Sequence, residues 1–122
     1  MNHQPLEWSQ RCSLRIYVTY HQVSPNSRFW HRHFGPSLGQ KLLQLAKAQD
    51  VHQAILYHTK AGYLAKEGIS HHFAESTPAS HPLCLELIDT YEIIHAFIEK
   101  NRPLLQEALL LLTNLDSFQR VV

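Results

Sequence analysis

Two segments of the chain alternate strictly between apolar and polar positions. In residues 13–20 one face would carry only apolar or aromatic side chains, namely Leu14, Ile16, Val18 and Tyr20. In residues 82–88 leucines occupy positions 83, 85 and 87, and the opposite face carries Cys84, Glu86 and Ile88. A period of two residues is typical of a strand with one buried face. Two more strands are predicted at residues 52–59, which have an apolar centre at 54–57, and at the apolar run of residues 108–115. The second run is apolar on both faces, so we expect it to be central in its sheet.

A helix is predicted over residues 37–50, between the first and second strands. Ser37 and Gln40 form an S-x-x-Q capping box, in which the hydroxyl and the amide each satisfy an otherwise unpaired backbone N–H. Four apolar residues at helical spacing form its predicted buried stripe: Leu38, Leu42, Leu45 and Ala46.

A second helix is predicted directly after the strand at residues 82–88. Asp89 is expected to cap its N-terminus, and Glu92 suits the positive end of the helix. The helix should end by Asn101, because Pro103 cannot easily continue it. We expect its buried face to consist of Tyr91, Ile94, Phe97 and Ile98.

The order of these elements is β-α-β-β-α-β, which predicts an α+β, ferredoxin-like fold. Right-handed crossovers through both helices give one four-stranded antiparallel sheet with the two helices on one face. The first strand then lies between the third and the fourth. Apolar residues on the other sheet face suggest contact between subunits. On that face we expect Arg15 and Glu86 to pair across adjacent strands.

The segment at residues 60–81, called the arm below, is the most unusual part of the chain. It joins the second and third strands, where a hairpin connection of roughly 2–5 residues is usual. It carries charged residues, two glycines and several histidines. Connections of this length in a compact domain are typical of binding arms and lids. We therefore expect the arm to be the working part of the protein.

Composition and charge narrow the class of protein. With 122 residues, 44% hydrophobic and 17% charged, the chain suits one globular domain, at residues 13–118. A polar lead (1–12) and a tail (119–122) flank it. The formal net charge of +1 gives no argument for nucleic acid or an anionic membrane as partner. The first ten residues lack the apolar core of a signal peptide, and no apolar run approaches the ~20 residues of a membrane span. We expect a cytoplasmic protein without membrane insertion.

Catalytic motifs are absent from the sequence. No G-x-S-x-G or Walker A pattern occurs. Cys12 and Cys84 fall toward opposite ends of the predicted sheet, farther apart than the ~7 Å that a disulfide tolerates. Cys84 lies inside a strand, where a thiol is more often inert filler than a nucleophile. We expect a protein that is not an enzyme and has no resident cofactor.

The ten histidines raise metal binding as an alternative function. His31 and His33 are close together in a loop, and His71 and His72 are adjacent in the arm. Imidazole suits Zn²⁺, Cu²⁺ and Ni²⁺. However, no C-x-x-C or H-E-x-x-H pattern accompanies these pairs.

Three segments together resemble a PII-like family of uncharacterised bacterial proteins, whose members are often encoded beside fluoride-channel genes. They are the strand at residues 14–18, the Trp30-His31 dipeptide ahead of a Pro-x-Leu-led helix, and the helix segment at residues 92–97. The resemblance covers residues 13–118. It implies a homotrimer that senses a small anionic ligand, an adenine nucleotide, in clefts between subunits. It also implies that such a protein regulates a partner, a membrane transporter or an enzyme. The metal-binding protein CutA shares this type of fold, which makes a trimeric metal-binding protein the alternative.

The same resemblance assigns roles to individual residues. The arm takes the place of the T-loop of PII proteins, and residues 100–107 take the place of their second ligand loop. The implied ligand-binding residues are Lys60, Gly62, Tyr63, Lys66, Lys100 and Arg102. Other members carry a glycine-rich stretch after the second strand, whereas this chain has only Gly62 and Gly68 there. Phosphate binding here would therefore depend more on Lys and Arg charge than on backbone N–H groups.

Overall fold

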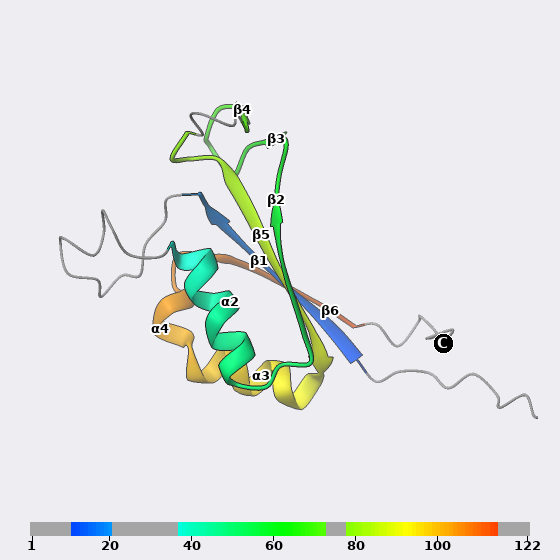
Figure 1. Ribbon diagram of the computed structural model, residues 1–122. Helices are drawn as coiled ribbons and strands as arrows, with labels where there is room; N and C mark the ends of the chain where they lie inside the picture. The colour runs from blue at the N-terminus through cyan, green and yellow to red at the C-terminus, as the bar shows by residue number, and fades with distance from the viewer. Residues whose placement is uncertain (1–10, 21–36, 73–77, 115–122) are drawn as a thin grey trace, which may run out of the picture.

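The computed structural model describes residues 11–20, 37–72 and 78–114 (Figure 1). In chain order, its elements are β1 (Arg11–Thr19), α2 (Leu38–Ala48), β2 (Gln53–His58), β3 (Ala61–Gly62), β4 (Ser70–His71), β5 (Pro82–Thr90), α3 (Tyr91–Lys100), α4 (Arg102–Leu105) and β6 (Leu109–Asn114). Four of the strands form the main sheet, and β3 and β4 form a separate two-stranded ribbon. The predicted N-terminal lead and C-terminal tail lie almost wholly outside the described residues.

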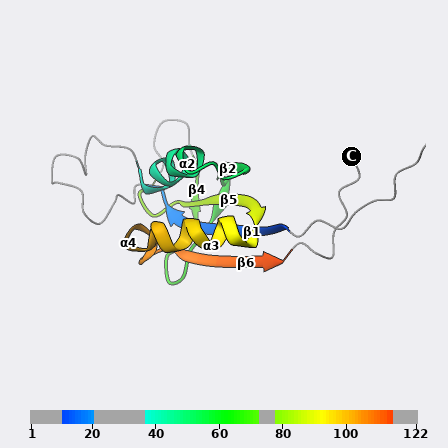
Figure 2. The same cartoon turned by 90° about the horizontal axis from the view of Figure 1, so that it is seen from below.

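The main sheet has the strand order β2-β5-β1-β6, with every neighbouring pair antiparallel. Figure 2 shows the strands in this order from below. β1 therefore lies between β5 and β6, as the sequence predicted for the first strand. The prediction of a central fourth strand was wrong, because β6 is an edge strand. The strands β2, β5 and β1 pair side by side, and the last strand adds to the free edge of β1. An apolar run alone does not distinguish a central strand from an edge strand of this kind.

The hydrophobic core lies between one sheet face and the two longer helices. The alternation predicted for β1 and β5 is confirmed, since one set of side chains is buried: Leu14, Ile16, Val18, Leu83, Leu85 and Leu87. Leu38, Leu42 and Ala46 of α2 and Ile94 and Phe97 of α3 join the same core. Both helices therefore lie on one face of the sheet (Figure 1).

The start of α2 agrees with the sequence prediction. The hydroxyl of Ser37 accepts a hydrogen bond from the backbone N–H of Gln40, at 3.3 Å. Gly39 is buried, and a Cβ at that position would lie 3.4 Å from Cδ1 of Leu56 on β2. The missing side chain thus allows the first turn of the helix to approach the sheet closely.

The start of α3 differs from the prediction by one residue. Thr90, not Asp89, is the N-cap, and its hydroxyl accepts from the backbone N–H of Ile93 at 3.4 Å. Asp89 is still in β5, where one carboxylate oxygen accepts from the N–H of His52 at 2.7 Å and the other from the N–H of Thr90 at 2.6 Å. A threonine hydroxyl can cap a helix as an aspartate does. Asp89 instead joins the beginning of β2 to the end of β5.

The predicted buried face of α3 is correct for Ile94 and Phe97 and wrong for Tyr91. Tyr91 is 54% exposed and stacks on His95, one turn further along, with ring centroids 5.7 Å apart. The helix begins directly after β5, so its first turn lies at the end of the sheet (Figure 1). At this position Tyr91 does not reach the core, and its ring stacks on His95 at the outer surface of the helix.

Replacing Asp89 with alanine is expected to lower the free energy of unfolding by about 1–3 kcal/mol. Two backbone N–H groups would lose their acceptor, and this part of the chain is largely buried, with Asp89 7% exposed. Urea unfolding of both proteins measures the difference. Glu92→Ala is the matched control, because that carboxylate is exposed in the first turn of the same helix and should contribute less than about 1 kcal/mol. An equal effect of the two substitutions would contradict the role of Asp89.

The second face of the sheet, called the open face below, carries no helix of the described chain. Its side chains include exposed apolar residues on both edge strands: Ile55, Tyr57, Leu109 and Leu111. Between them lies the predicted ion pair, with Arg15 Nε 3.3 Å from Glu86 Oε2. Ser13 donates to the same carboxylate at 3.4 Å and the Tyr57 hydroxyl at 3.5 Å, so a polar network crosses the centre of an otherwise apolar surface.

Candidate functional site: the arm between β2 and β5

The arm contains more regular structure than a loop prediction implies. β3 and β4 pair antiparallel, with Ala61 opposite His71 and Gly62 opposite Ser70. The ribbon is extended by a hydrogen bond from the N–H of His72 to the carbonyl of Lys60, at 2.8 Å. The arm continues beyond the end of the sheet, away from the helices (Figure 1). The interpretation of residues 60–81 as a loop throughout is therefore wrong, because local backbone pairing divides the segment.

His81, at the end of the arm, is fully buried and holds the base of the arm together. Its Nε2 lies 2.7 Å from the carbonyl oxygen of Thr59. Its Nδ1 lies 2.8 Å from the hydroxyl of Ser70. A carbonyl only accepts, so Nε2 of His81 donates to Thr59. One imidazole thus links the residue before the arm, the middle of the arm and its last residue.

Further contacts surround this anchor. The hydroxyl of Thr59 donates to the carbonyl of Pro82 at 2.7 Å, and the N–H of Tyr20 donates to the carbonyl of His81 at 2.6 Å. The ring of His72 lies 5.9 Å from that of His81, and His58 lies 6.2 Å from His72. Sequence reasoning missed His58 and His81, because only the fold brings the end of β2 and the start of β5 together. The only hint in the sequence was their position, because His58 lies just before the arm and His81 is its last residue.

The turn between β3 and β4 exposes side chains of mixed character. Tyr63 is 59% exposed and Ile69 is 70% exposed, and Lys66 between them is also exposed. The turn is closed by a hydrogen bond from the N–H of Glu67 to the carbonyl of Leu64, at 3.0 Å. The turn therefore presents two apolar side chains to solvent beside charged ones.

The predicted ligand-binding residues fall into two separate groups. Lys60, Gly62, Tyr63 and Lys66 belong to the arm, whereas Lys100 ends α3 and Arg102 begins α4. The arm and the α3–α4 corner lie at different ends of the subunit (Figure 1). A single chain therefore does not bring the two groups together.

Arg102 is already paired within its own chain. Its Nε donates to Glu99 at 3.2 Å, and a second nitrogen of the guanidinium bonds the other carboxylate oxygen. This contact raises the pKa of Arg102 and lowers the pKa of Glu99. The imidazole of His95 lies 3.7 Å from the same carboxylate. All three side chains are about half exposed or more, so the guanidinium is accessible to an anion that displaces Glu99.

The two glycines of the arm do not form a phosphate cradle. Neither has a positive φ. A Cβ at Gly62 would lie 3.4 Å from Cγ of Pro82, and one at Gly68 would meet open space. The residue that does adopt the left-handed conformation is Ala65, with φ of 48°. Curled backbone that binds phosphate uses alternating right- and left-handed residues, so a cradle at these glycines has no support.

The structure describes two of the four histidines that were predicted as alternative metal ligands. His71 is the last residue of β4 and His72 follows it, while His31 and His33 lie outside the described residues. Within residues 11–20, 37–72 and 78–114, no three His, Cys, Asp or Glu side chains are grouped to hold a metal ion.

Cys12 and Cys84 form no disulfide with each other and lie toward opposite ends of the β1–β5 ladder. Cys12 pairs in register with Asp89, and Cys84 pairs with Tyr17. Burial raises the pKa of Cys84, which keeps the thiol protonated at neutral pH. An inert role for Cys84, as the sequence predicted, agrees with this environment.

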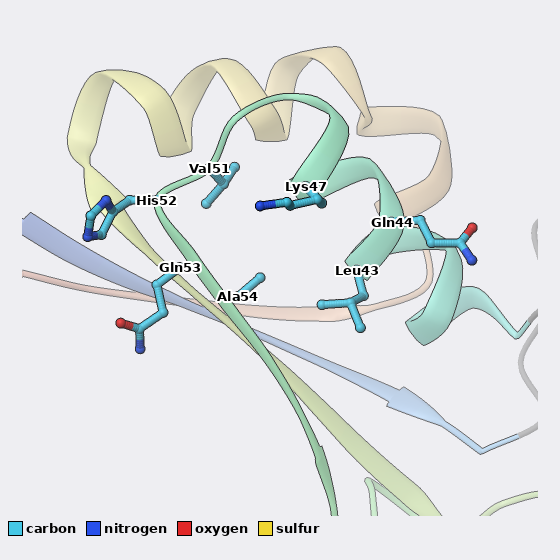
Figure 3. Close-up of a pocket in the computed structure, with 7 residues that line it drawn as sticks. All are labelled: Leu43, Gln44, Lys47, Val51, His52, Gln53 and Ala54. Carbon is cyan, nitrogen blue, oxygen red and sulfur yellow. The ribbon is translucent and has the colours of Figure 1, made fainter.

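One pocket, of about 510 Å³, lies between α2 and the beginning of β2 (Figure 3). Leu43, Gln44, Lys47, Val51, His52, Gln53 and Ala54 line it. The side chain of Lys47 points toward Val51 and His52, whereas Gln44 points away (Figure 3). No predicted ligand residue contributes to this groove, which lies at the opposite end of β2 from the arm.

Among the helices of the described segments, none combines the length and the apolarity that a bilayer crossing requires. A comparison with curated proteins finds no match to this chain. A family model does match, over residues 12–117, which is most of the chain and includes the arm and the α3–α4 corner. The chain therefore belongs to the family described as DUF190, Uncharacterized ACR, COG1993.

Proposed function

We propose that this protein is a PII-like regulatory protein, a homotrimer of ferredoxin-like subunits in the cytoplasm. A small anionic ligand, an adenine nucleotide, binds between subunits and changes how the arm contacts a partner transporter or enzyme. The observation that carries this proposal is the arm itself. It is a structured projection with an anchored base and an exposed turn, placed between the two strands where a PII-type subunit has its T-loop.

The separation of the two basic groups supports a ligand site between subunits. Lys60 and Lys66 on the arm lie apart from Lys100 and Arg102 at the α3–α4 corner (Figure 1). An anion bound by both groups therefore needs two chains. The open face supports the trimer, because exposed apolar side chains on both edge strands are stabilised when a second subunit covers them.

The ion pair of Arg102 and Glu99 gives the site a resting state. A phosphate group can accept the same pair of hydrogen bonds from the guanidinium of Arg102, and it would then replace the carboxylate of Glu99. Because both side chains are exposed to solvent, breaking this ion pair costs little free energy. Ligand contacts made in only one state of the arm would then shift the population toward that state.

Thermal shift with ATP, ADP, AMP and cyclic nucleotides, each with and without Mg²⁺, tests this function. A nucleotide at a hundred times its dissociation constant is expected to stabilise the protein by about 2.7 kcal/mol. Arg102→Ala and Lys100→Ala should each reduce the shift. Lys41→Ala is the matched control, since this exposed lysine lies on α2 and should leave the shift unchanged.

Two outcomes would contradict the proposal. The absence of a shift with every nucleotide would argue against nucleotide sensing. A shift only with Zn²⁺, Cu²⁺ or Ni²⁺ on metal-stripped protein would instead support the trimeric metal-binding alternative. In that case, variants of His71 and His72 would be the next to examine.

A further inference from the structure

The groove between α2 and the beginning of β2 has the dimensions of a small-molecule site. Its volume of about 510 Å³ is within the range of roughly 300–1,000 Å³ that ligand sites in proteins occupy. It is formed by one chain and shares no lining residue with the arm or with the α3–α4 corner. The groove is therefore a candidate site apart from the nucleotide site proposed above.

The backbone around the groove is held in place by hydrogen bonds. Helix α2 ends in a Schellman motif, in which the N–H of Val51 donates to the carbonyl of Ala46 at 3.0 Å. Asp50 in this turn has a φ of 59°, which is the left-handed conformation of the motif. The N–H of His52 donates to Asp89 at 2.7 Å and so fixes the next residue to the end of β5. A ligand would meet a wall that is already formed, so little ordering of the protein opposes its binding.

The side chains that line the groove combine apolar surface with one permanent cation. Leu43, Val51 and Ala54 supply the apolar part. The side chain of Lys47 extends toward Val51 and His52 (Figure 3), and it forms no ion pair with any residue that the structure describes. The lining residues include no aspartate or glutamate. The groove thus presents one positive charge beside a hydrocarbon wall.

This combination favours a singly charged ligand over a phosphate. Phosphate sites usually combine several donors, such as arginine forks or a helix N-terminus. Here the helix end beside the groove is a C-terminus, which carries partial negative charge, and Lys47 is the one lysine in the lining. A carboxylate needs a single cationic partner, and an apolar body attached to it gains free energy by covering the hydrocarbon wall.

We propose that the groove between α2 and β2 binds a small organic acid, with its carboxylate on Lys47 and its apolar body against Leu43, Val51 and Ala54. The side-chain amide of Gln53, which also lines the groove, supplies a second donor for the carboxylate. This site depends neither on the nucleotide nor on the assembly proposed above, because one chain supplies all of its residues.

Two-dimensional NMR of the full chain, titrated with small acids, tests the site. The probes are benzoate, hexanoate and benzamide, which has nearly the shape of benzoate without its charge. Both acids should shift the amide signals of residues 43–54 in a saturable manner. Benzamide should bind about threefold more weakly than benzoate, the effect of one exposed ion pair.

Variants of the lining residues identify the partner of the carboxylate. Lys47→Gln removes the charge but keeps a donor, so it should weaken benzoate by about threefold and leave benzamide unchanged. Lys41→Gln is the matched control, because this exposed lysine of the same helix does not line the groove and should leave both affinities unchanged. Gln53→Glu places a competing carboxylate in the groove at nearly constant size, and it should also weaken benzoate.

Four outcomes would overturn the proposal. The first is the absence of a saturable shift at residues 43–54 with either acid. The second is equal affinity for benzoate in the wild type and Lys47→Gln, or equal affinity of the wild type for benzoate and benzamide, because the charge would then not be recognised. The third is a set of shifts confined to β1 and β6, which would assign the acids to the open face. The fourth is tighter binding of inorganic phosphate than of both acids at the same residues.

Discussion

Replacing Phe97 with alanine is expected to lower the free energy of unfolding by about 3–5 kcal/mol. A loss of this size is a large part of the net stability of a typical domain. Phe97 is 2% exposed and joins α3 to the core above the central strands. Removing its ring takes away apolar burial and leaves a cavity that the helix and sheet cannot close fully. Urea denaturation, with both proteins at the same concentration, measures the loss.

Tyr91→Ala is the matched control for this experiment. Both residues are aromatic and lie on α3, and spacing alone predicted both as buried. Tyr91 is 54% exposed, so its replacement should change the free energy of unfolding by less than about 0.5 kcal/mol. A large loss at Tyr91, or a small loss at Phe97, would mean that the helix packs with a different face toward the sheet.

Introducing a charge at Leu109 is expected to separate the proposed trimer into single chains. Leu109 is 57% exposed on β6 and lies opposite Tyr17 on the open face, so its substitution disturbs the isolated subunit little. If subunits cover this face, Leu109→Glu would bury an unpaired carboxylate in every copy, at several kcal/mol each. Sedimentation velocity should show the mass falling from three times the chain mass of 14.2 kDa to 14.2 kDa.

Ile93→Glu is the control for the charge itself. Ile93 is 39% exposed on α3, remote from the open face. A carboxylate in the first turn of this helix is favourable, so the variant should remain folded and keep its assembly state. A wild-type protein that sediments as a single chain, or a Leu109→Glu protein that stays assembled, would contradict the proposal that subunits contact each other through the open face.

The edge strand β6 shows why an apolar run does not reveal whether a strand is central or at the edge of its sheet. Its leucines satisfy the pattern of a central strand, yet three of them are about half exposed: Leu109, Leu111 and Leu112. Only Leu110 packs against the core, from the face that the helices cover. Burial depends on what lies above and below a strand, and this information is absent from the strand's own residues.

The helix caps show that the sequence can locate a helix start to within about one residue without identifying the capping residue. Ser37 was predicted and confirmed, because a serine before an apolar periodic run has few alternatives. At α3, Asp89 and Thr90 are neighbours and either can cap a helix. The tertiary structure selects Thr90, since the carboxylate of Asp89 accepts from the N–H of His52, just before β2. A contact between residues far apart in sequence thus decided a local question.

Alternation and helical spacing by themselves determined the strands β1 and β5, the two main helices, and the inward-facing residues of β1 and β5. These features follow from the need to bury one face of each element, because that need sets the spacing of apolar residues along the chain. Only the tertiary structure decided that β6 is an edge strand, that the arm and the α3–α4 corner lie at different ends of the subunit, and that His81 joins Thr59 to Ser70. Each depends on segments meeting across the fold, where backbone pairing and burial, and not local spacing, set the partners.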